Sequence, residues 1–441
     1  MQIHLYKKVC LLVSVLLIPI IFNANANAGG GYFQAGYGPV GVQMAGAVTA
    51  VAQDAFAGSS NPAKLIAAGN QLDLGLLFMN PHRKIKRTGA TEPNSDYNFS
   101  TTSKNSLFII PEFAYSKQIN DELAIGIMTY ANGGLNMEYH GSTGVAETNL
   151  NPDACGAKPG NFTGGCGELG FDIGQFIVAP TLAWKFAPGQ SIGISPLLSL
   201  ETFKIYGLQA FAPVSRAPGS VSNRGRDYAF GAGLRVGWFG EFNEWLSLGA
   251  AYSTKIYMQD YDKYKGLFAE GSFDTPANYS VGIAIKPWDK WLVAFDIFRI
   301  DFRDVKALSN GVLPSLVDPV NNPLGSKSGS GFGWDRNQTN YKFGVAYKAT
   351  PRLTLRAGHT FSDRTNDNDI NAVSFGVLAI SPIRTTSAGF TWQANADNKL
   401  HAALSYNDGS TYRGPSALFP GARESARPFY YVFSFSWSGS I

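Results

Sequence analysis

The sequence is poor in charge, in cysteine and in long apolar runs. Asp, Glu, Lys and Arg make up 15% of the 441 residues, against about 25% in an ordinary soluble domain. The chain has only three cysteines and five histidines. After the first 28 residues no stretch approaches the about 20 continuous apolar residues of a transmembrane helix. These deficits exclude a helical membrane protein and argue against a soluble enzyme.

Catalytic and nucleotide-binding patterns are missing as well. His82, His140, His359 and His401 are isolated and lack metal-ligand spacing. There is no G-x-S-x-G, and no Gly-rich loop followed by Lys-Ser or Lys-Thr. No basic run or stripe is present, which argues against a nucleic acid partner. The sequence therefore predicts no enzyme, no cofactor and no metal site, although a Ser/His pair facing each other across strands would escape spacing arguments.

Residues 1–28 have the pattern of a secretory signal peptide. Two lysines precede an apolar run over residues 9–22, and the segment ends in the small-x-small cleavage site Ala26-Asn27-Ala28. The apolar run is too short to span a bilayer comfortably, so a membrane anchor is disfavoured. Removal of the segment deletes two lysines and no acidic residue, and the formal charge falls from +4 to +2.

The two cysteines that remain, Cys155 and Cys166, lie close together in a stretch rich in Gly, Asn and Pro. In an oxidising compartment we expect them to form a disulfide. Its short loop limits the expected stabilisation to about 3 kcal/mol. A metal site is the sharper alternative, but no His or further Cys lies nearby to complete a coordination shell.

After the first 70 residues the chain alternates between apolar and polar or small residues. In the first such run Leu72, Leu74 and Leu76 occupy one face, and Asp73 and Gly75 occupy the other. Similar runs of roughly ten residues recur to the C-terminus. Counted against the strand template, they predict about fourteen strands.

The connections between these runs alternate strictly in length. Six are short: near residue 120, and at 188–189, 241–243, 289–290, 350–351 and 395–397. Seven are long and rich in Gly, Ser and Asn: 88–106, 133–170, 208–226, 260–276, 303–339, 362–382 and 408–427. Outer-membrane barrels have this layout, with tight periplasmic turns and long extracellular loops. A soluble sandwich or propeller has no reason to alternate so strictly.

Tryptophan placement points the same way. Six tryptophans lie within a few residues of a predicted short turn: Trp184, Trp238, Trp245, Trp288, Trp291 and Trp392. Trp437 lies near the C-terminus, and only Trp334 falls in a long loop. Indoles favour the membrane interface, because one edge is apolar and the ring N–H reaches water. The pattern indicates a periplasmic aromatic girdle; a general preference of Trp for strand ends is the simpler alternative.

Together these patterns predict an all-β fold, a transmembrane antiparallel β-barrel of about 14 strands over residues 71–441, in the outer membrane of a Gram-negative bacterium. The last strand resembles the aromatic C-terminal signature of such barrels, but the chain ends on Ile441. Charged residues of both signs fall on the inward phase: Asp73, Glu112, Glu201, Arg235, Lys255, Lys286, Asp296, Lys342 and Arg356. Mixed charges of this kind are expected in any barrel lumen.

Residues 29–70 differ from the rest of the chain. They are rich in Gly and Ala, show no period-two run and end near Asn61-Pro62-Ala63. Such a segment before a fourteen-stranded barrel resembles the hatch of the FadL family (the OMPP1/TodX group), outer-membrane transporters for long-chain fatty acids and other hydrophobic compounds. The resemblance rests on Tyr32-Phe33-Gln34, on Gly41 with Ala45-Gly46, and on Asp54-Ala55 followed by Asn61-Pro62-Ala63. The number of strands and the alternation of short and long connections agree with this family over the whole mature chain.

The resemblance implies a hatch that blocks the lumen and passive transport. In the family, extracellular loops capture the ligand, an internal pocket receives it, and a gap at a kinked strand releases it sideways. Here that strand is the third, with Gly126, Gly133 and Gly134 as candidate weak points. The hatch or gating residues are Phe33, which fills the pocket when it is empty, and Asn61, Pro62 and Ala63. An ordinary turn before the first strand is the simpler reading of Asn61-Pro62.

The substrate class stays open at this stage. A fatty acid carboxylate requires a cation in the pocket, and the candidates are Arg235, Lys286, Lys342, Arg356 and Arg384. Aromatic or other neutral hydrocarbons could follow the same route. A general porin, with residues 29–70 as a periplasmic linker, and a structural surface barrel are the competing classes. The expected partners are hydrophobic small molecules, outer-membrane lipid and lipopolysaccharide, with the protein a monomer.

Overall fold

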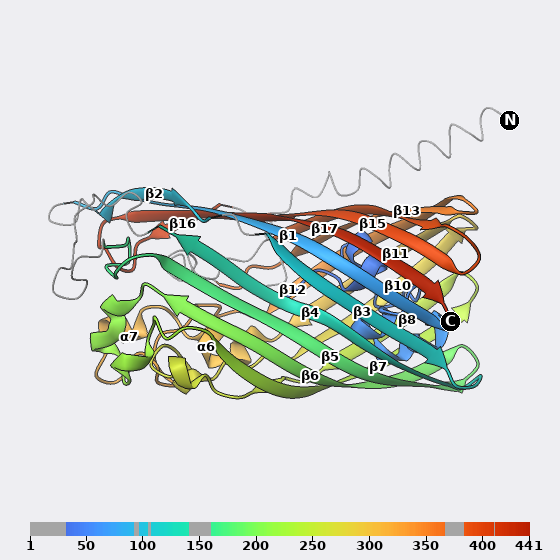
Figure 1. Ribbon diagram of the computed structural model, residues 1–441, viewed down its shortest axis with the longest axis horizontal. Coiled ribbons are helices and arrows are strands. Elements are labelled where there is room, and N and C mark those ends of the chain that lie inside the picture. The colour runs from blue at the N-terminus through green and yellow to red at the C-terminus, as the bar shows by residue number, and fades with distance from the viewer. Residues whose placement is uncertain (1–31, 92–96, 105–106, 141–159, 367–382, 410) are drawn as a thin grey trace, which may run out of the picture.

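The computed structural model describes residues 32–91, 97–104, 107–140, 160–366, 383–409 and 411–441. Their strands form one antiparallel sheet, which closes on itself where β1 (Gln71–Thr88) pairs with β17 (Arg423–Ser440) (Figure 1). The structure is therefore the closed 14-stranded barrel that the strand count predicts. The expected signal peptide and Cys155 lie outside the described residues.

The long strands between β1 and β17 are β3 (Phe108–Gln118), β4 (Leu123–Tyr139), β5 (Leu169–Ala187), β6 (Gln190–Tyr206), β7 (Asp227–Asn243), β8 (Leu246–Ser253), β10 (Asn278–Trp288), β11 (Trp291–Ile300), β12 (Gln338–Thr350), β13 (Leu353–Ser362), β14 (Arg384–Gln393) and β15 (Asn398–Asp408). Three short strands extend the wall at the end that carries the long loops: β2 (Phe99–Thr102), β9 (Tyr257–Met258) and β16 (Tyr412–Pro415). We call this the loop end, and the end with the tight turns and the C-terminus the turn end (Figure 1).

Several strands reach further toward the loop end than the sequence pattern indicated. β4 continues to Tyr139, with Leu135, Met137 and Tyr139 buried on its inward face, and β17 begins at Arg423 rather than at residue 428. The backbone ladder therefore continues above the apolar band, where the outward face of a strand can be polar. As a result the loops predicted at 133–170 and 408–427 are shorter than expected.

In the described parts of the loops at that end, the helices are short. These are η3 (Gln209–Val214), η4 (Pro218–Ser220), η5 (Asp262–Tyr264), η6 (Ala269–Gly271), η7 (Phe302–Asp304), α6 (Lys306–Ser309) and α7 (Pro314–Val317). Among the described residues, no helix combines the length and the apolar character needed to cross a membrane.

Residues 32–70, which we call the plug, occupy the lumen in the half nearer the turn end (Figure 1, blue). The plug contains α2 (Gly38–Gln43), α3 (Ala57–Ser60), η1 (Pro62–Lys64) and α4 (Leu65–Ala68). Its side chains and backbone bond to strands on every side of the barrel, from β1 to β14. A segment with partners around the whole wall must lie inside it.

The outer surface matches a membrane environment. Trp184, Trp245, Trp288 and Trp392 are exposed beside the tight turns, with 44–53% of their surface accessible. Trp334 is different, because it is buried among the loops at the opposite end. The exposed indoles form the aromatic girdle expected at one membrane interface.

Candidate functional site

The wall has a break in its hydrogen bonding between β3 and β4. β3 pairs with β1 as far as Phe108, but it pairs with β4 only from Gln118 to Phe113. β4 itself continues along β5 from Leu123 to Tyr139. Between Tyr130 and the loop end, β4 therefore has no ladder with β3 in the described residues. Nearer the loop end β4 has partners on that side again, because Lys104 N donates to Glu138 O at 2.8 Å and Glu138 N donates to Ser103 Oγ at 3.0 Å.

A β-bulge at Asn132 marks the start of this break. The register between β4 and β5 shifts between Ala131 and Gly133, so Asn132 is the extra residue. A bulge bends the strand and disrupts the ladder locally. The Asn132 side chain is buried, and its Nδ2 donates a hydrogen bond to Gln175 Oε1 at 2.7 Å. The bulge is thus held in place from the lumen side.

The first residues of the plug cover the break from inside. Gln34 N donates to Asn132 O at 3.1 Å, and Gly134 N donates to Tyr32 O at 3.1 Å. Phe33 and Gly133 form an isolated antiparallel bridge between these bonds. A Cβ atom on Gly133 would collide with the Tyr32 carbonyl, so only glycine permits this approach. Two of the glycines expected at the weak point, Gly133 and Gly134, therefore lie at the break and contact the plug.

Gly126 has another environment. It pairs with Ser116 inside the intact β3–β4 ladder. A Cβ atom at this position would lie 2.9 Å from Leu65 Cδ2 of the plug. Gly126 therefore accommodates the plug below the break and is not part of the break itself.

An aromatic cluster surrounds the covering segment. The Tyr32 ring lies 5.0 Å from the Phe33 ring and 6.2 Å from Trp334, centroid to centroid. The Phe33 ring lies 6.3 Å from Phe302 and 6.5 Å from Phe298, in edge-to-face geometry. These loop and strand rings bury Tyr32 and Phe33 almost completely. The space next to the break is therefore filled with apolar rings.

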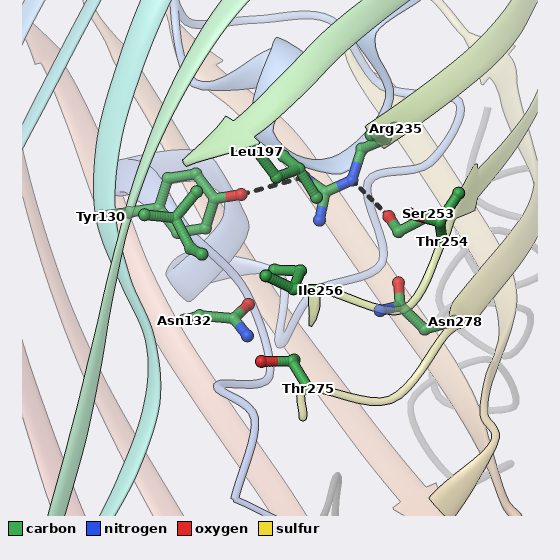
Figure 2. A pocket seen from close by; sticks show the side chains of 10 residues that line it. Tyr130, Asn132, Leu197, Arg235, Ser253, Thr254, Ile256, Thr275 and Asn278 are labelled. Atoms are coloured by element: carbon green, nitrogen blue, oxygen red, sulfur yellow. Dashed lines mark hydrogen bonds between the residues drawn. The ribbon is translucent and has the colours of Figure 1, made fainter. Parts of the chain in front are cut away.

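A small cavity of about 10 Å³, room for about one water molecule, lies beside Asn132 (Figure 2). Arg235 is the one cation among its lining residues. Its Nε donates to Ser253 Oγ at 2.7 Å, and one terminal nitrogen donates to Tyr130 Oη at 3.0 Å and also to Ser59 O of the plug. Ligand pockets usually measure about 300–1,000 Å³. The volume of this cavity is below that range, because side chains of the plug and the loops fill the surrounding space.

The other proposed cations lie elsewhere. Lys342 Nζ donates to Ala35 O at 2.9 Å and lies 4.5 Å from the Phe298 ring centroid. Arg356 donates to Gln43 Oε1 at 2.8 Å and to Gln53 Oε1 at 2.6 Å. Both therefore hold the plug.

Two candidates do not reach the lumen interior. Lys286 is exposed near the turn end of β10. Arg384 is exposed on β14 on the same phase as Phe390 and Trp392, and so it faces outward. Neither residue lines the cavity. The strand phase of Arg384 was visible in the sequence.

Wall carboxylates hold the body of the plug by its backbone. Asp296 Oδ2 on β11 accepts from Val48 N at 2.8 Å and from Thr49 N at 2.7 Å. Asp73 Oδ2 on β1 accepts from Ala55 N at 2.7 Å. Hydrogen bonds to a charged acceptor in a buried site are stronger than neutral ones. These inward-facing acids are attachment points for the plug. The sequence alone had given them no role.

The Asn61-Pro62-Ala63 tripeptide is fully buried against β6 and β7. Asn61 Nδ2 donates to Trp238 O at 2.8 Å and to Thr49 O at 3.2 Å, and its Oδ1 accepts from Ala63 N at 3.1 Å. Ser191 Oγ on β6 donates to Ala63 O at 2.9 Å. The tripeptide thus joins two parts of the plug to two strands of the wall.

Glycines in the wall make this close approach possible. A Cβ atom on Gly237 would overlap Asn61 Oδ1, and one on Gly193 would lie 2.5 Å from Ala63 N. The same crowding by the plug recurs at further strand glycines: Gly249, Gly282, Gly344, Gly358 and Gly389. The sequence showed the high glycine content, but not that these glycines form a ring facing the plug. Their shared inward phase was the available signal.

Lys64 and Asp54 supply charge inside the plug. Lys64 Nζ donates to Val51 O at 2.9 Å, to Ser60 Oγ at 2.7 Å and also to Val48 O. Asp54 Oδ2 accepts from Val40 N at 3.0 Å. Burial lowers the pKa of Lys64 to about 8 and raises the pKa of Asp54 above its usual value, although each charge opposes the shift of the other. Both side chains therefore bond to other parts of the plug and stabilise its fold.

Cys166 is disulfide-bonded, while Cys155, its expected partner, lies outside the described residues. Among the described residues no group of His, Cys, Asp and Glu could hold a metal ion.

Comparison with known proteins identifies the family. Residues 159–413 match the family model described as outer membrane protein transport protein (OMPP1/FadL/TodX). A Pseudomonas aeruginosa FadL homologue is similar in structure, with a TM-score of 0.66 and 15% identity, over 93% of this chain and 100% of that chain. The Pseudomonas putida toluene transporter TodX has a TM-score of 0.64 and 19% identity, over 93% and 100%.

The Ralstonia pickettii toluene transporter TbuX has a TM-score of 0.59 and 17% identity, over 91% of this chain and 98% of that chain. No curated protein matches the sequence. At these identities the solved structures support the fold, and the family model, which covers more than half of the chain, supports the family. The protein belongs to the OMPP1/FadL/TodX family of transport proteins in the Gram-negative outer membrane.

Proposed function

We propose that the protein takes up hydrophobic molecules passively and releases them sideways through the wall between β3 and β4. The observation that carries this proposal is the break in strand pairing at Asn132, covered from inside by residues 32–34. A hydrophobic molecule leaving through the wall passes directly into the membrane interior, so it does not return to water. An axial exit would not give this advantage.

The cover over the break is weak enough to open. Lipid offers no hydrogen bonds, so an unpaired strand edge in the wall needs an internal partner. Residues 32–34 supply it through two backbone hydrogen bonds and the rings of Tyr32 and Phe33. A ligand that takes the place of the Phe33 ring would retain the apolar contacts while the backbone cover moves. In this proposal Phe33 is the gating residue.

The body of the plug closes the axial path in the same proposal. Its bonds to Asp73, Asp296, Arg235 and Arg356 come from strands on different sides of the lumen. Asn61, Pro62 and Ala63 complete this attachment at β6 and β7. A segment attached on all sides argues against an open porin with a free periplasmic linker.

The loop end offers an apolar entrance. Leu308 and Val312 are buried beneath the loop surface, whereas Val317 on α7 and Val320 just beyond it are 76% and 86% exposed. Exposed apolar side chains next to an aromatic interior can collect hydrophobic ligands from the outside. We assign the first contact with substrate to this surface.

Arg235 supports long-chain fatty acids as the substrates. It is the cation at the cavity, and a guanidinium suits a carboxylate. Neutral aromatic hydrocarbons are the second candidate. The ring cluster around Phe33 supports them, and two of the similar structures are described as toluene transporters.

Replacing Arg235 by methionine separates the two candidates. We expect Arg235→Met to weaken oleate binding by about tenfold or more, because a buried charge-assisted bond is lost, and to leave toluene uptake nearly unchanged. Arg356→Met is the matched control, since Arg356 also holds the plug but does not line the cavity. Conductance in planar bilayers verifies that the plug of each variant stays closed. Equal oleate binding by both variants would contradict a carboxylate role for Arg235.

A further inference from the structure

A group of cations lies on the outer surface of the barrel near the loop end. Lys84 and Lys86 on β1, Arg423 and Arg427 on β17 and Arg413 on β16 are all exposed. Their strand phase is that of the lipid-facing residues lower on the same strands, such as Leu74 and Phe433. Figure 1 shows β1, β17 and β16 side by side at this end. We call these five residues the basic patch.

Strand register brings the charges together. Lys84 is directly opposite Arg427, and Ser425 lies between Lys86 on one side and Arg413 on the other. Like charges directly opposite each other on neighbouring strands destabilise a sheet. The cations of the basic patch therefore need anions from outside the patch to offset their repulsion.

The part of the chain that the structure describes does not pair these cations with anions. Among the described residues, none of the five cations takes part in a salt bridge. Glu424, the acid nearest in sequence, faces the lumen and is bound to Arg87 at 2.6 Å. Asp408, the outward-facing acid on β15, lies opposite Arg384 and Phe429. The basic patch thus faces outward without an ion pair among the described residues.

The height of the basic patch matches the outer membrane interface. Trp437 of the girdle at the turn end is opposite Leu74, and Lys84 lies ten residues further along β1. At about 3.4 Å per residue and a tilt of about 40°, this is a rise of about 26 Å. The apolar band of an outer-membrane barrel is about 25 Å tall. The cations therefore lie at the level of the headgroups in the leaflet on the loop side.

We propose that the basic patch binds the phosphate groups of the outer-leaflet glycolipid, lipopolysaccharide. Lys and Arg side chains at headgroup level bind lipid phosphates by charge and by charge-assisted hydrogen bonds. The ligand fixes a patch of lipid against β1 and β17 and relieves the repulsion between Lys84 and Arg427. This site lies on the outer surface of β1, β16 and β17, whereas the proposed exit opens between β3 and β4.

The test measures binding of purified lipid A to the detergent-solubilised full-length protein, by native mass spectrometry or thermophoresis. The bisphosphorylated form is compared with its fully dephosphorylated form. We expect the phosphorylated form to bind more tightly, and a Lys84→Ser/Arg427→Ser variant to lose about tenfold or more of that affinity. The matched control is Lys290→Ser/Arg352→Ser, which removes two exposed cations from turns at the other end. Heat-dependent migration on gels verifies that each barrel is folded.

Several results would overturn the proposal. One is equal affinity for the two lipid forms, and another is equal loss in the patch variant and the control. A third is displacement of bound lipid A by millimolar inorganic phosphate as effectively as by unlabelled lipid A. That result would make the basic patch a general anion site. If the patch variant does not fold, Lys86→Ser/Arg413→Ser, which removes no directly opposed pair, provides the same comparison.

Discussion

The two parts of the plug are held to the barrel in different ways. In the described part of the chain, residues 32–37 bond to β4 by two backbone bonds and by Tyr37, whose hydroxyl donates to Asn132 Oδ1 at 2.7 Å, and to β12 only through Lys342, which donates to Ala35 O. Residues 38–70 are fixed by side chains from many strands, including Asp73, Asp296 and Arg235. Under the proposed function, the first part moves while the second part stays.

The largest effect is expected from crowding the fixed part. In Gly237→Ala the new Cβ would overlap Asn61 Oδ1, so the tripeptide cannot dock against β7. We expect steady conductance in planar bilayers to rise at least tenfold over the closed wild-type protein, because the lumen is no longer sealed. Gly174→Ala is the control, since its Cβ would meet no atom closer than 3.9 Å. An unchanged conductance in Gly237→Ala would mean that the tripeptide is not needed for closure.

A smaller effect is expected in the movable part. Phe33→Ala removes a ring that packs on Phe298 and Phe302, so a hydrophobic ligand no longer has to displace it. We expect affinity for oleate or toluene to increase severalfold, measured by equilibrium binding. Tyr37→Ala should have less effect, because that ring packs on Tyr130 at 4.4 Å and bonds to Asn132. Equal changes in the two variants would count against a pocket-filling role for Phe33.

The smallest effect is expected from a single bond to the tripeptide. Ser191→Ala removes the hydrogen bond to Ala63 O, which stabilises the docked plug by about 1 kcal/mol. Amide hydrogen exchange around Ala63 should speed up about fivefold, while exchange at Gln34 stays the same. Ser199→Ala is the control, because Ser199 accepts a bond from Gln175 within the wall and does not contact the plug. Faster exchange at both positions would show that the plug opens as one unit.

Much of the fold follows from local patterns. Alternation predicted the strands, and the lengths of the connections predicted the two ends of the barrel, because turn and loop residues carry strong local signals. The Asn61-Pro62-Ala63 motif identified the plug segment. The upper limits of β4 and β17 were missed. After the bulge of β4 the apolar residues lie on the inward face, and at the start of β17 the outward residues are charged or polar, so neither stretch continues the outward apolar pattern of the strand below it.

The details of the site could not be read from the sequence. The bulge at Asn132 depends on register between β4 and β5, which no local pattern specifies. Asp296 and Asp73 looked like ordinary lumen charges, and only the fold places plug amides against them. Of the five cations proposed for a carboxylate, one lines the cavity, because strand phase and height both decide that position.

Deletion of Asn132 tests whether the break at this residue is the exit. Without the extra residue the register of β4 becomes regular, so the strand can pair with β3 and close the break. Asn132→Ala is the matched control, since it keeps the bulge and removes only the side chain. Uptake of radiolabelled oleate and toluene by cells that carry the folded variants is measured against cells without the protein. The account predicts background uptake for the deletion and substantial uptake for Asn132→Ala; wild-type uptake by the deletion variant would contradict it.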